Sequence, residues 1–457
     1  MRPINRGRMQ AMVRSALSLM FSSTRRILAM KKRSLGNLIR ILGPGFVSGA
    51  ADNDPAGIAT YTQVGAQFGY GQLWTAPFAL PLLIAIQEAC ARIGAVTGKG
   101  LAALIKEHYG PIVLYASVAI IVVTNTINIG ADIGAMAEAI RLLVPIPFIV
   151  LVLGTAFVTL SLEIFSSYRT YAKYLKGLSA VAFVYLLTAF IVKEPWLRIL
   201  KATFVPHIEL SFAFLLIILA NIGTTIAPYL FFWETSQEVE EDKAAGRIGI
   251  TGKVTISRDA IDNMRLDNAI GMFASQLITW SIIVVSATVL NQHGVTNLNT
   301  AADAAKALEP LVHSFPYAGF LAKLLFAIGI VSAGLLVVPV LAGSAGYALA
   351  ESLGWDEGLD LKFTRAHGFY GVITASTLVG VAINFVGIDP IKLLVYTSVL
   401  NGVAAVPLIF LIIRISGNEA IMGDYVSRKL SIGFTWLAFM AMSGAAIAAL
   451  FTFLRGG

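Results

Sequence analysis

The chain has 457 residues, of which 57% are hydrophobic and 13% are charged, and its mean hydropathy is +0.76. A soluble domain needs about a quarter of its residues charged, so this composition excludes one and predicts an all-α polytopic membrane protein. The net charge of +8 does not indicate nucleic-acid binding, because the positive residues flank apolar runs instead of forming one patch. The single cysteine, Cys90, excludes an internal disulfide and any multi-thiolate metal site, so oxygen ligands are expected for a bound metal.

The N-terminal region, residues 1–37, is rich in arginine, lysine, serine and methionine, and the first acidic residue of the chain is Asp52. Its longest apolar run, Ala16 to Phe21, is too short for a signal-peptide core and lacks a small-residue cleavage site. The region is therefore interpreted as a basic cytoplasmic tail that contacts anionic headgroups or is disordered. Met30 is an alternative start.

Apolar runs of about 20 residues predict about eleven transmembrane spans. They lie near 38–69, 72–95, 112–142, 146–163, 174–193, 211–240, 268–290, 317–349, 368–387, 391–414 and 432–454.

Lysine and arginine are dense before the first span and recur after every second span, which predicts a cytoplasmic N-terminus. With an odd number of spans the C-terminus is then outside, and the expected location is the cell membrane. The recurring positive residues are Lys99, Lys106, Arg169, Lys173, Lys176, Lys243, Arg247, Lys253, Arg258, Arg265, Lys362, Arg365, Arg414, Arg428 and Lys429.

Two of the spans are interrupted in their middle. The first carries NDPAGI from Asn53 to Ile58, and the sixth carries NIGTTIAPYLFF from Asn221 to Phe232. Because proline donates no backbone N–H and clashes with the preceding turn, each span is expected to be a broken helix. The alternative is a simple proline kink in a structural helix.

The two interruptions define the expected domain organisation. They lie five spans apart, which predicts an inverted five-plus-five repeat whose discontinuous helices meet at the bilayer midplane. The repeats cover about 38–193 and 211–414 and together form a ten-helix transport core over 38–414, followed by an eleventh helix over 432–454.

The first interruption offers an acid and free backbone oxygens. Asp54 supplies a carboxylate, and an ionisable side chain at mid-membrane marks a pathway or a site by default. Unwinding at Pro55, Ala56 and Gly57 would free carbonyl oxygens, which together with a carboxylate suit a hard cation. Asp52 and Asn53 are expected either to line the vestibule or to cap the second half-helix. These two residues precede the break in the sequence.

The second interruption offers carbonyls and hydroxyls. Carbonyls near Thr224, Thr225 and Ile226 would be released just before Pro228. The hydroxyls of the two threonines and of Tyr229 could bind an ion or its waters. An anionic substrate would need arginine or exposed helix N-termini instead, and no arginine lies near either interruption.

Further acids lie in the third and sixth spans. Asp132 and Glu138 lie six positions apart, nearly on opposite sides of a helix, so they are not expected to form one cluster. Asp132 could serve a proton relay or a structural hydrogen bond. Glu234 precedes an acidic run, Glu238 to Asp242, which is interpreted as a solvated helix end or cytoplasmic mouth that concentrates cations.

Other classes of site are not indicated. The histidines fall outside the predicted spans, which argues against a histidine proton shuttle and a haem or copper site. No nucleophile with a base and no cofactor loop lies near the interruptions, so the chain is not expected to be an enzyme or to need a cofactor. Its expected partners are divalent metal ions and the lipid bilayer, with no obligatory protein partner.

Several motifs over about residues 38–425 identify a family. They are GPGF at Gly43–Phe46, DP at Asp54–Pro55, GAQFGY and LW after it, QEACARIGAVTGKGLA at Gln87–Ala102, the AP of the sixth span, and NGVAAVPLIF through MGD in the tenth. The chain resembles the Nramp divalent-metal transporters, which have the LeuT-type fold, and ARIGAVTGKGLA is the most specific match.

The resemblance implies a metal site, with departures. Typical members hold the metal with the aspartate and asparagine of DPGN, a carbonyl and the methionine sulfur of MPH, and a glutamine in the tenth helix. Here Asp54 is kept, whereas the asparagine position is Gly57 and the methionine position is Ala227. The histidine beside that methionine is Tyr229, and the glutamine aligns with Ser398.

The family's proton route is also altered. Its third-helix aspartate and glutamate read Asp132 and Ala135, and a later histidine of the sixth helix aligns with Glu234. The resemblance therefore leaves Asp132 and Glu234 as a possible residual proton or polar pathway.

These departures predict a hydrated ion. Without the soft sulfur the site loses its preference for transition ions over magnesium, and the smaller side chains leave room for water. Magnesium usually keeps several waters when it binds. The pattern resembles the Nramp-related magnesium transporters, a branch that carries magnesium and manganese without proton coupling.

Three alternatives stay open. A proton-coupled manganese or iron importer of the ordinary Nramp type would need Asp132 and Glu234 to replace the missing groups. The aluminium-carrying plant relatives fit less well, since they keep the asparagine and the histidine. A cation channel or metal-sensing receptor could use the same helices, but broken paired helices suit alternating access better.

Overall fold

The structure is a computed structural model that describes residues 42–165, 182–192, 196–248, 254 and 256–454. The predicted basic tail, 1–37, and the positive residues Arg169, Lys173, Lys176 and Lys253 lie outside this part. The chain forms two units, Met1–Gly43 and Pro44–Gly457, and the account below concerns the second.

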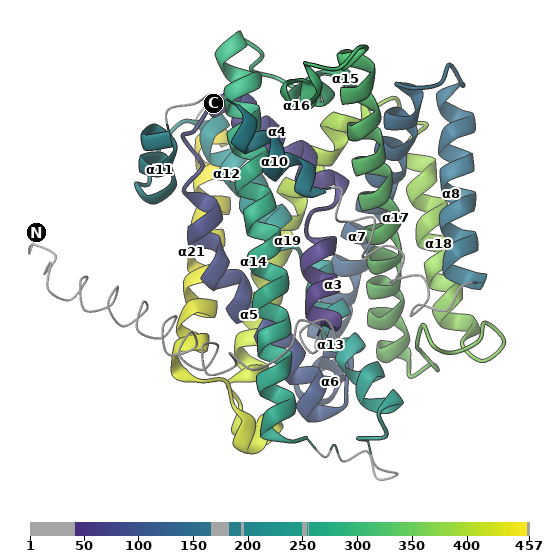
Figure 1. The fold of residues 1–457 in the computed structure, drawn as a ribbon. Helices are drawn as coiled ribbons and strands as arrows, with labels where there is room; N and C mark the ends of the chain where they lie inside the picture. Colours follow the sequence, from purple (N-terminus) through teal and green to yellow (C-terminus); the bar gives the residue numbers. More distant parts are fainter. Residues whose placement is uncertain (1–41, 166–181, 193–195, 249–253, 255, 455–457) are drawn as a thin grey trace, which may run out of the picture. The chain divides into compact units, whose positions relative to one another are not determined.

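The described residues in the first half of this unit form a series of helices joined by connecting segments (Figure 1). Its helices are α3 (Pro44–Ala51), α4 (Pro55–Phe68), α5 (Thr75–Thr97), α6 (Leu101–His108), α7 (Pro111–Arg141), α8 (Phe148–Phe165), α10 (Phe183–Ile191) and α11 (Trp196–Phe204).

The second half of the unit also consists of helices joined by connecting segments. Its helices are α12 (Phe212–Thr225), α13 (Pro228–Ala244), α14 (Arg258–Val289), α15 (Ala301–Ala305), α16 (Glu309–Val312), α17 (Ala318–Leu353), α18 (His367–Ile383), α19 (Pro390–Ser416), α20 (Glu419–Met422) and α21 (Lys429–Leu454). Three short 3-10 turns accompany them, η2 (Asn291–His293), η3 (Lys306–Leu308) and η4 (Gly423–Tyr425).

The predicted spans correspond to these helices. Within the described residues, eight helical stretches are long and apolar enough to cross a membrane, with α12 and α13 counted as one. Of the remaining three spans, the first is divided into α3 and α4, and the ninth is the shorter apolar helix α18. The fifth, near 174–193, lies partly outside the described residues and is represented by α10.

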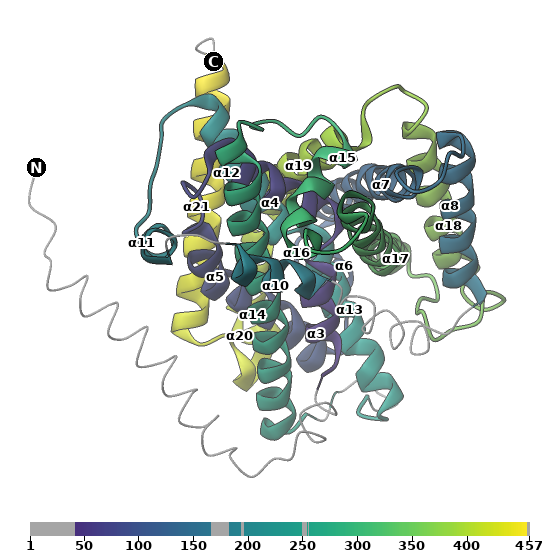
Figure 2. The same cartoon turned by 45° about the horizontal axis from the view of Figure 1, so that its top comes forward.

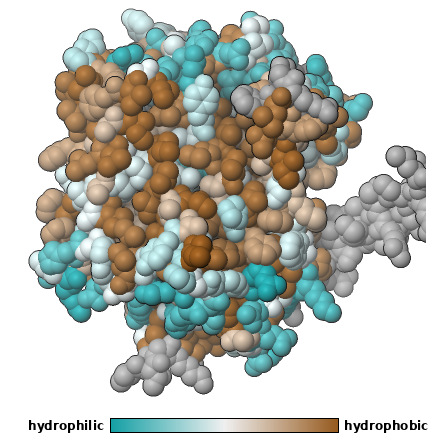
Figure 3. Space-filling view, turned by 180° about the vertical axis from the view of Figure 1, so that it is seen from behind, coloured by the Kyte–Doolittle hydropathy of each residue, from teal (hydrophilic) through white to brown (hydrophobic). Residues whose placement is uncertain are grey.

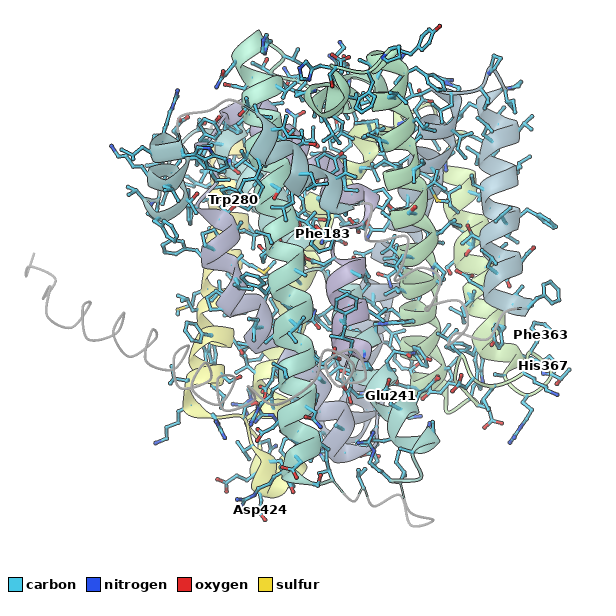
Figure 4. All side chains as sticks on the ribbon, in the orientation of Figure 1. Phe183, Glu241, Trp280, Phe363, His367 and Asp424 are labelled. Carbon is cyan, nitrogen blue, oxygen red and sulfur yellow. The ribbon has the colours of Figure 1, made fainter. Side chains whose placement is uncertain are left out.

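The surface of the described part suits a bilayer. Figure 3 shows a broad apolar band on one face with hydrophilic residues toward both ends. Large apolar side chains such as Phe157, Leu378 and Ile447 are exposed, which would be costly in water but is expected against lipid. In Figure 4 Phe363, His367 and Asp424 lie toward the same end of the bundle. Phe363 lies in the connection between α17 and α18, His367 is the first residue of α18, and Asp424 lies in η4.

The two broken helices cross in the interior. α3 contacts α13, and α4 contacts α12, so each half of one broken helix packs against a half of the other. α14 packs along both α3 and α4, and α19 packs along α4 and α12. α7, α8, α17 and α18 gather at one side of this centre (Figure 2).

Two glycine pairs permit the closest of these approaches. A Cβ atom at Gly49 of α3 would lie 2.3 Å from the backbone of Gly271 in α14. A Cβ atom at Gly223 of α12 would lie 2.5 Å from the backbone nitrogen of Gly402 in α19. Each broken helix is therefore held against a continuous neighbour at a distance that only glycine allows.

Candidate functional site

The first break lies where the sequence predicts it. α3 ends at Ala51 and α4 begins at Pro55, so Asp52 to Asp54 connect the two half-helices. Because Pro55 has no N–H, the Ala51 carbonyl loses its helical donor. Asp54 is the N-cap of α4, and its Oδ1 accepts a hydrogen bond from the Gly57 N–H at 2.5 Å. The acid is thus fixed by one oxygen at the start of a helix.

The second break is shorter. α12 ends at Thr225 and α13 begins at Pro228, which leaves Ile226 and Ala227 between them, both fully buried. Pro228 cannot donate to the Thr224 carbonyl, so this oxygen also lacks its helical donor. The Thr224 hydroxyl is buried and has no hydrogen-bond partner among the described residues. Thr224 therefore brings two available oxygens to the break.

Tyr229 connects the two breaks. Its hydroxyl lies 3.1 Å from the Ala51 carbonyl oxygen and 3.2 Å from Oδ2 of Asp54. A hydroxyl has one hydrogen, so it donates to one of these acceptors at a time. The Tyr229 carbonyl in turn accepts from the Ser344 hydroxyl at 3.0 Å. The free oxygens of the first break are thereby covered by a side chain from the second broken helix.

A second tyrosine makes a parallel contact. The Tyr61 hydroxyl of α4 lies 3.0 Å from the Thr225 hydroxyl, which donates to the Asn221 carbonyl at 2.8 Å. Thr225 is therefore satisfied within the structure, in contrast to Thr224.

The expectation that Asp52 or Asn53 caps the second half-helix is wrong, since Asp54 makes the cap. Asp52 instead accepts a short hydrogen bond from Ser275 of α14, and the Asn53 amide lies 3.5 Å from the Gly49 carbonyl oxygen. Asn53 and Ser275 line a cavity of about 30 Å³ beside α3. That volume is enough for a water molecule, which suits a lining role for Asn53.

Gly57 and Ala227 contribute no side-chain donor atom to the two breaks. A Cβ atom at Gly57 would lie 3.1 Å from both the Asp52 carbonyl oxygen and Asp54 Oδ1, and 3.2 Å from the Tyr61 ring. A larger residue there requires these neighbours to shift by a few tenths of an ångström. Ala56 and Ala227 are buried and carry no polar side-chain atom. The donors named at both breaks are all oxygens.

Ser398 lies close to the first broken helix but is already bonded. Its hydroxyl is 2.8 Å from that of Thr60 in α4, and it donates to the Leu394 carbonyl at 3.0 Å. The structure thus places Ser398 beside α4, as the resemblance predicts, and its part in metal binding stays a prediction.

Asp132 and Glu234 lie in different surroundings. Asp132 of α7 is fully buried, and neither carboxylate oxygen has a hydrogen-bond partner among the described residues. Glu234 of α13 accepts from the Ser48 hydroxyl at 2.5 Å and from the Asn268 amide at 3.0 Å. Glu234 therefore holds α3, α13 and α14 together, whereas Asp132 has no such structural bond.

The acidic run after Glu234 is only partly a solvated helix end. Glu241 is exposed, but Glu238 and Asp242 are buried at 7% and 1% exposure. They are buried because α13 passes between α5, α6 and α17 over this stretch. Asp242 lies 2.8 Å from Arg247. Figure 4 labels Glu241 toward the same end of the bundle as Asp424.

Two residues that support the site were missed in the sequence. Asp267 of α14 accepts from the backbone N–H groups of Gly45 at 2.8 Å and Phe46 at 3.1 Å, and so caps the start of α3. Ser275 holds Asp52. Asp267 could have been noticed as an acid at the edge of an apolar span, whereas nothing distinguishes Ser275 from other span serines.

The architecture defines a multi-pass membrane protein with two broken helices that meet in its interior. Comparison of the chain with family models gives a match over residues 45–452 to the family described as Nramp, natural resistance-associated macrophage protein-like. The chain belongs to this family.

Individual relatives also align with this chain over most of its length. The chain is 26% identical over 422 residues to a protein of Ralstonia nicotianae named divalent metal cation transporter MntH, with 89% of this chain and 90% of the relative covered. A relative from Pseudomonas aeruginosa, divalent metal cation transporter MntH 1, is 26% identical over 435 residues, with 91% and 92% covered.

Solved structures agree on the fold. The crystal structure of the Eremococcus coleocola manganese transporter with an aromatic bis-isothiourea compound is similar at a TM-score of 0.70 and 18% identity, covering 91% of this chain and 86% of that chain. The crystal structure of MhsT with L-phenylalanine is similar at a TM-score of 0.57 and 13% identity, covering 90% and 98%. The predicted LeuT-type fold is confirmed.

Proposed function

We propose that this chain transports divalent metal cations and binds them between the two breaks, with Asp54 as the main anchor. The observation that carries the proposal is a buried carboxylate, 2% exposed, that shares the Tyr229 hydroxyl with the Ala51 carbonyl, an oxygen that proline has deprived of its helical donor. The proposal is supported by the family and by relatives named as divalent metal cation transporters.

The donors suit a hard cation. Oδ2 of Asp54, the Ala51 carbonyl and the Thr224 oxygens come from both broken helices. Carboxylate, carbonyl and hydroxyl oxygens are the ligands of magnesium, calcium and manganese. In this structure the Tyr229 hydroxyl lies within hydrogen-bonding distance of the first two acceptors and donates to one of them at a time, so an arriving ion displaces it or binds it through water.

For the identity of the ion, the comparisons favour the ordinary Nramp substrate. The similar solved structure is named a manganese transporter, and this supports manganese as the transported ion better than magnesium. With manganese we propose, as a separate step, proton coupling through Asp132 and Glu234. Both residues lie in membrane-spanning helices, α7 and α13.

One observation favours magnesium as a second candidate. The positions that carry asparagine and methionine in typical members are Gly57 and Ala227, so the donors named at both breaks include no sulfur. Magnesium prefers oxygen and keeps several waters, whereas sulfur would favour transition ions. Under this reading the ion binds largely hydrated and moves without a coupled proton.

Competition in liposomes tests the proposal and separates the two candidates. The full chain is reconstituted, and manganese uptake is measured against added magnesium, with a pH-sensitive dye inside. A manganese importer gives internal acidification and weak inhibition by magnesium; a magnesium transporter gives no acidification and inhibition at comparable concentrations. No uptake of either ion would overturn the transport proposal.

We also propose that the N-terminus is cytoplasmic, the C-terminus is outside and the protein resides in the cell membrane. Lys106 on α6 is exposed, and the chain's only cysteine, Cys90, is fully buried. A Lys106→Cys variant should react with a membrane-impermeant maleimide only after the membrane is opened, with the unmodified chain as control. Labelling of this variant in intact cells would show the opposite orientation and contradict the proposal.

A further inference from the structure

Among the described residues, Asp132 and Glu163 are buried acids whose carboxylate oxygens have no hydrogen-bond partner, and Asp132 is the one that lies in a helix packed against both broken helices. Asp132 in α7 is 0% exposed, and both of its carboxylate oxygens lack a hydrogen-bond partner among the described residues. A buried carboxylate costs several kcal/mol unless it is bonded, paired with a positive charge or neutralised.

Two neighbouring polar residues of α7 donate side-chain hydrogen bonds to other helices. Asn125, Asn128 and Asp132 follow each other at helical spacing and lie on one side of α7. The Asn125 amide donates to the Leu341 carbonyl at 2.9 Å. The Asn128 amide donates to the Asn401 side-chain oxygen of α19 at 2.8 Å. Asp132 alone of the three makes no such contact.

Asp132 lies on a helix that packs against the proposed ion site. Its carboxylate is close enough to Asp54 for the two charges to interact, and both are close enough to affect the Tyr229 hydroxyl. α7 contacts both α4 and α13, the helices that carry Asp54 and Tyr229. Among the described residues, no positive side chain contributes to the electrostatic surroundings of Asp132.

We propose that Asp132 supplies the second negative charge that balances the bound dication, acting through the water held by the ion. The inference rests on the proposed function. Asp54 alone leaves a dication with an uncompensated charge inside the membrane. The Asp52 carboxylate already accepts a hydrogen bond from Ser275, whereas neither oxygen of Asp132 is bonded among the described residues, so Asp132 is assigned the second charge. Within the described residues no group of three or more histidine, cysteine or acidic side chains is arranged to hold a metal, so Asp132 is assigned to the hydrated ion's outer surroundings.

This role differs from a proton relay in what it predicts. A relay changes how transport depends on pH but leaves the equilibrium affinity for the ion at fixed pH nearly unchanged. A charge-balancing group changes the affinity itself, and does so for any divalent cation. It should also act more strongly on a dication than on a monovalent ion, since the attraction scales with the ion's charge.

The test is equilibrium binding of Mn²⁺ and Mg²⁺ to the purified full chain, by titration calorimetry at one pH. Asp132→Asn should weaken binding of both ions on the order of 10- to 100-fold, and Asp132→Glu, which keeps the charge, should stay within about threefold. Glu163→Gln is the matched control. Glu163 of α8 is also buried, at 6% exposure, and unpartnered among the described residues, and binding should be unchanged.

The binding experiment distinguishes failure of the inference about Asp132 from failure of the proposed function. Equal affinity in Asp132→Asn and the unmodified chain overturns the inference, whether or not the pH dependence of transport changes, and leaves the proposed function standing. An unmodified chain that binds neither ion overturns the proposed function itself. Should Asp132→Asn fail to fold, Asp132→Ser, which is smaller and neutral, carries the same expectation of weaker binding.

Discussion

The two breaks contribute differently to the site. The break between α3 and α4 carries charge: Asp52 and Asp54 are both buried, and Asp54 also caps the helix that follows. The break between α12 and α13 consists of Ile226 and Ala227, which carry no charge or polar side-chain atom. Around it lie the available oxygens of Thr224 and a tyrosine hydroxyl.

This difference indicates that the α3–α4 break and the α12–α13 break have different roles in ion binding. Proline frees a backbone carbonyl at each break, so both can accept an ion in the same way. Only the first brings a carboxylate that makes cation binding favourable inside a membrane. The first break is thus expected to set whether a dication binds, and the second to set how closely protein atoms surround it.

The largest effect is expected from removing the charge of the first break. Asp54→Ala deletes the anchor and should lower uptake at least about 100-fold, because the remaining carboxylate of the break, Asp52, is already bonded to Ser275. Uptake into liposomes measures this. Asp52→Asn is the control, since it keeps a hydrogen-bonding group toward Ser275 and should lower uptake less. Near-normal transport by Asp54→Ala would place the site elsewhere.

A smaller effect is expected from restoring the typical donors. Gly57→Asn with Ala227→Met adds an amide oxygen at the first break and a sulfur at the second. Sulfur favours manganese over magnesium, so the affinity ratio should shift roughly tenfold, about 1.4 kcal/mol. Ala227→Met alone separates the contribution of the second break. An unchanged ratio in a variant that still binds would mean that the second break does not touch the ion.

The smallest effect is expected at Tyr229. Tyr229→Phe removes the hydroxyl that covers Asp54 and the Ala51 carbonyl, so an ion no longer competes with it and should bind about three- to tenfold more tightly. Tyr61→Phe is the matched control, because its hydroxyl contacts Thr225 instead. Weaker binding in Tyr229→Phe would show that this hydroxyl is a ligand and not a cover.

The sequence allows the breaks themselves to be predicted. Pro55 and Pro228 act locally, by removing a donor to the residue four positions earlier, and the structure interrupts both helices there. The spacing of apolar runs predicts the spans for the same reason, since it depends on helix length against bilayer thickness. The LeuT-type fold follows from these two local signals and the family motifs.

The contacts across the site could not be predicted. Tyr229 and Asp54 are 175 positions apart, and Glu234 and Ser48 are 186 apart. Which of them meet depends on how closely α3 and α14 approach, which Gly49 and Gly271 permit. The sequence leaves the cap of α4 undecided for a related reason, because the position at which α3 ends fixes which polar residue begins α4.

The most direct test of the account is the position of a bound ion. Crystals of the full chain grown with Mn²⁺ would locate the metal by its anomalous scattering. We predict a peak between the two breaks, about 2.0–2.6 Å from Oδ2 of Asp54 if bound directly or roughly 4 Å away through a water, with the Tyr229 hydroxyl displaced. A peak remote from Asp54, or one that persists unchanged in Asp54→Asn crystals, would contradict the account.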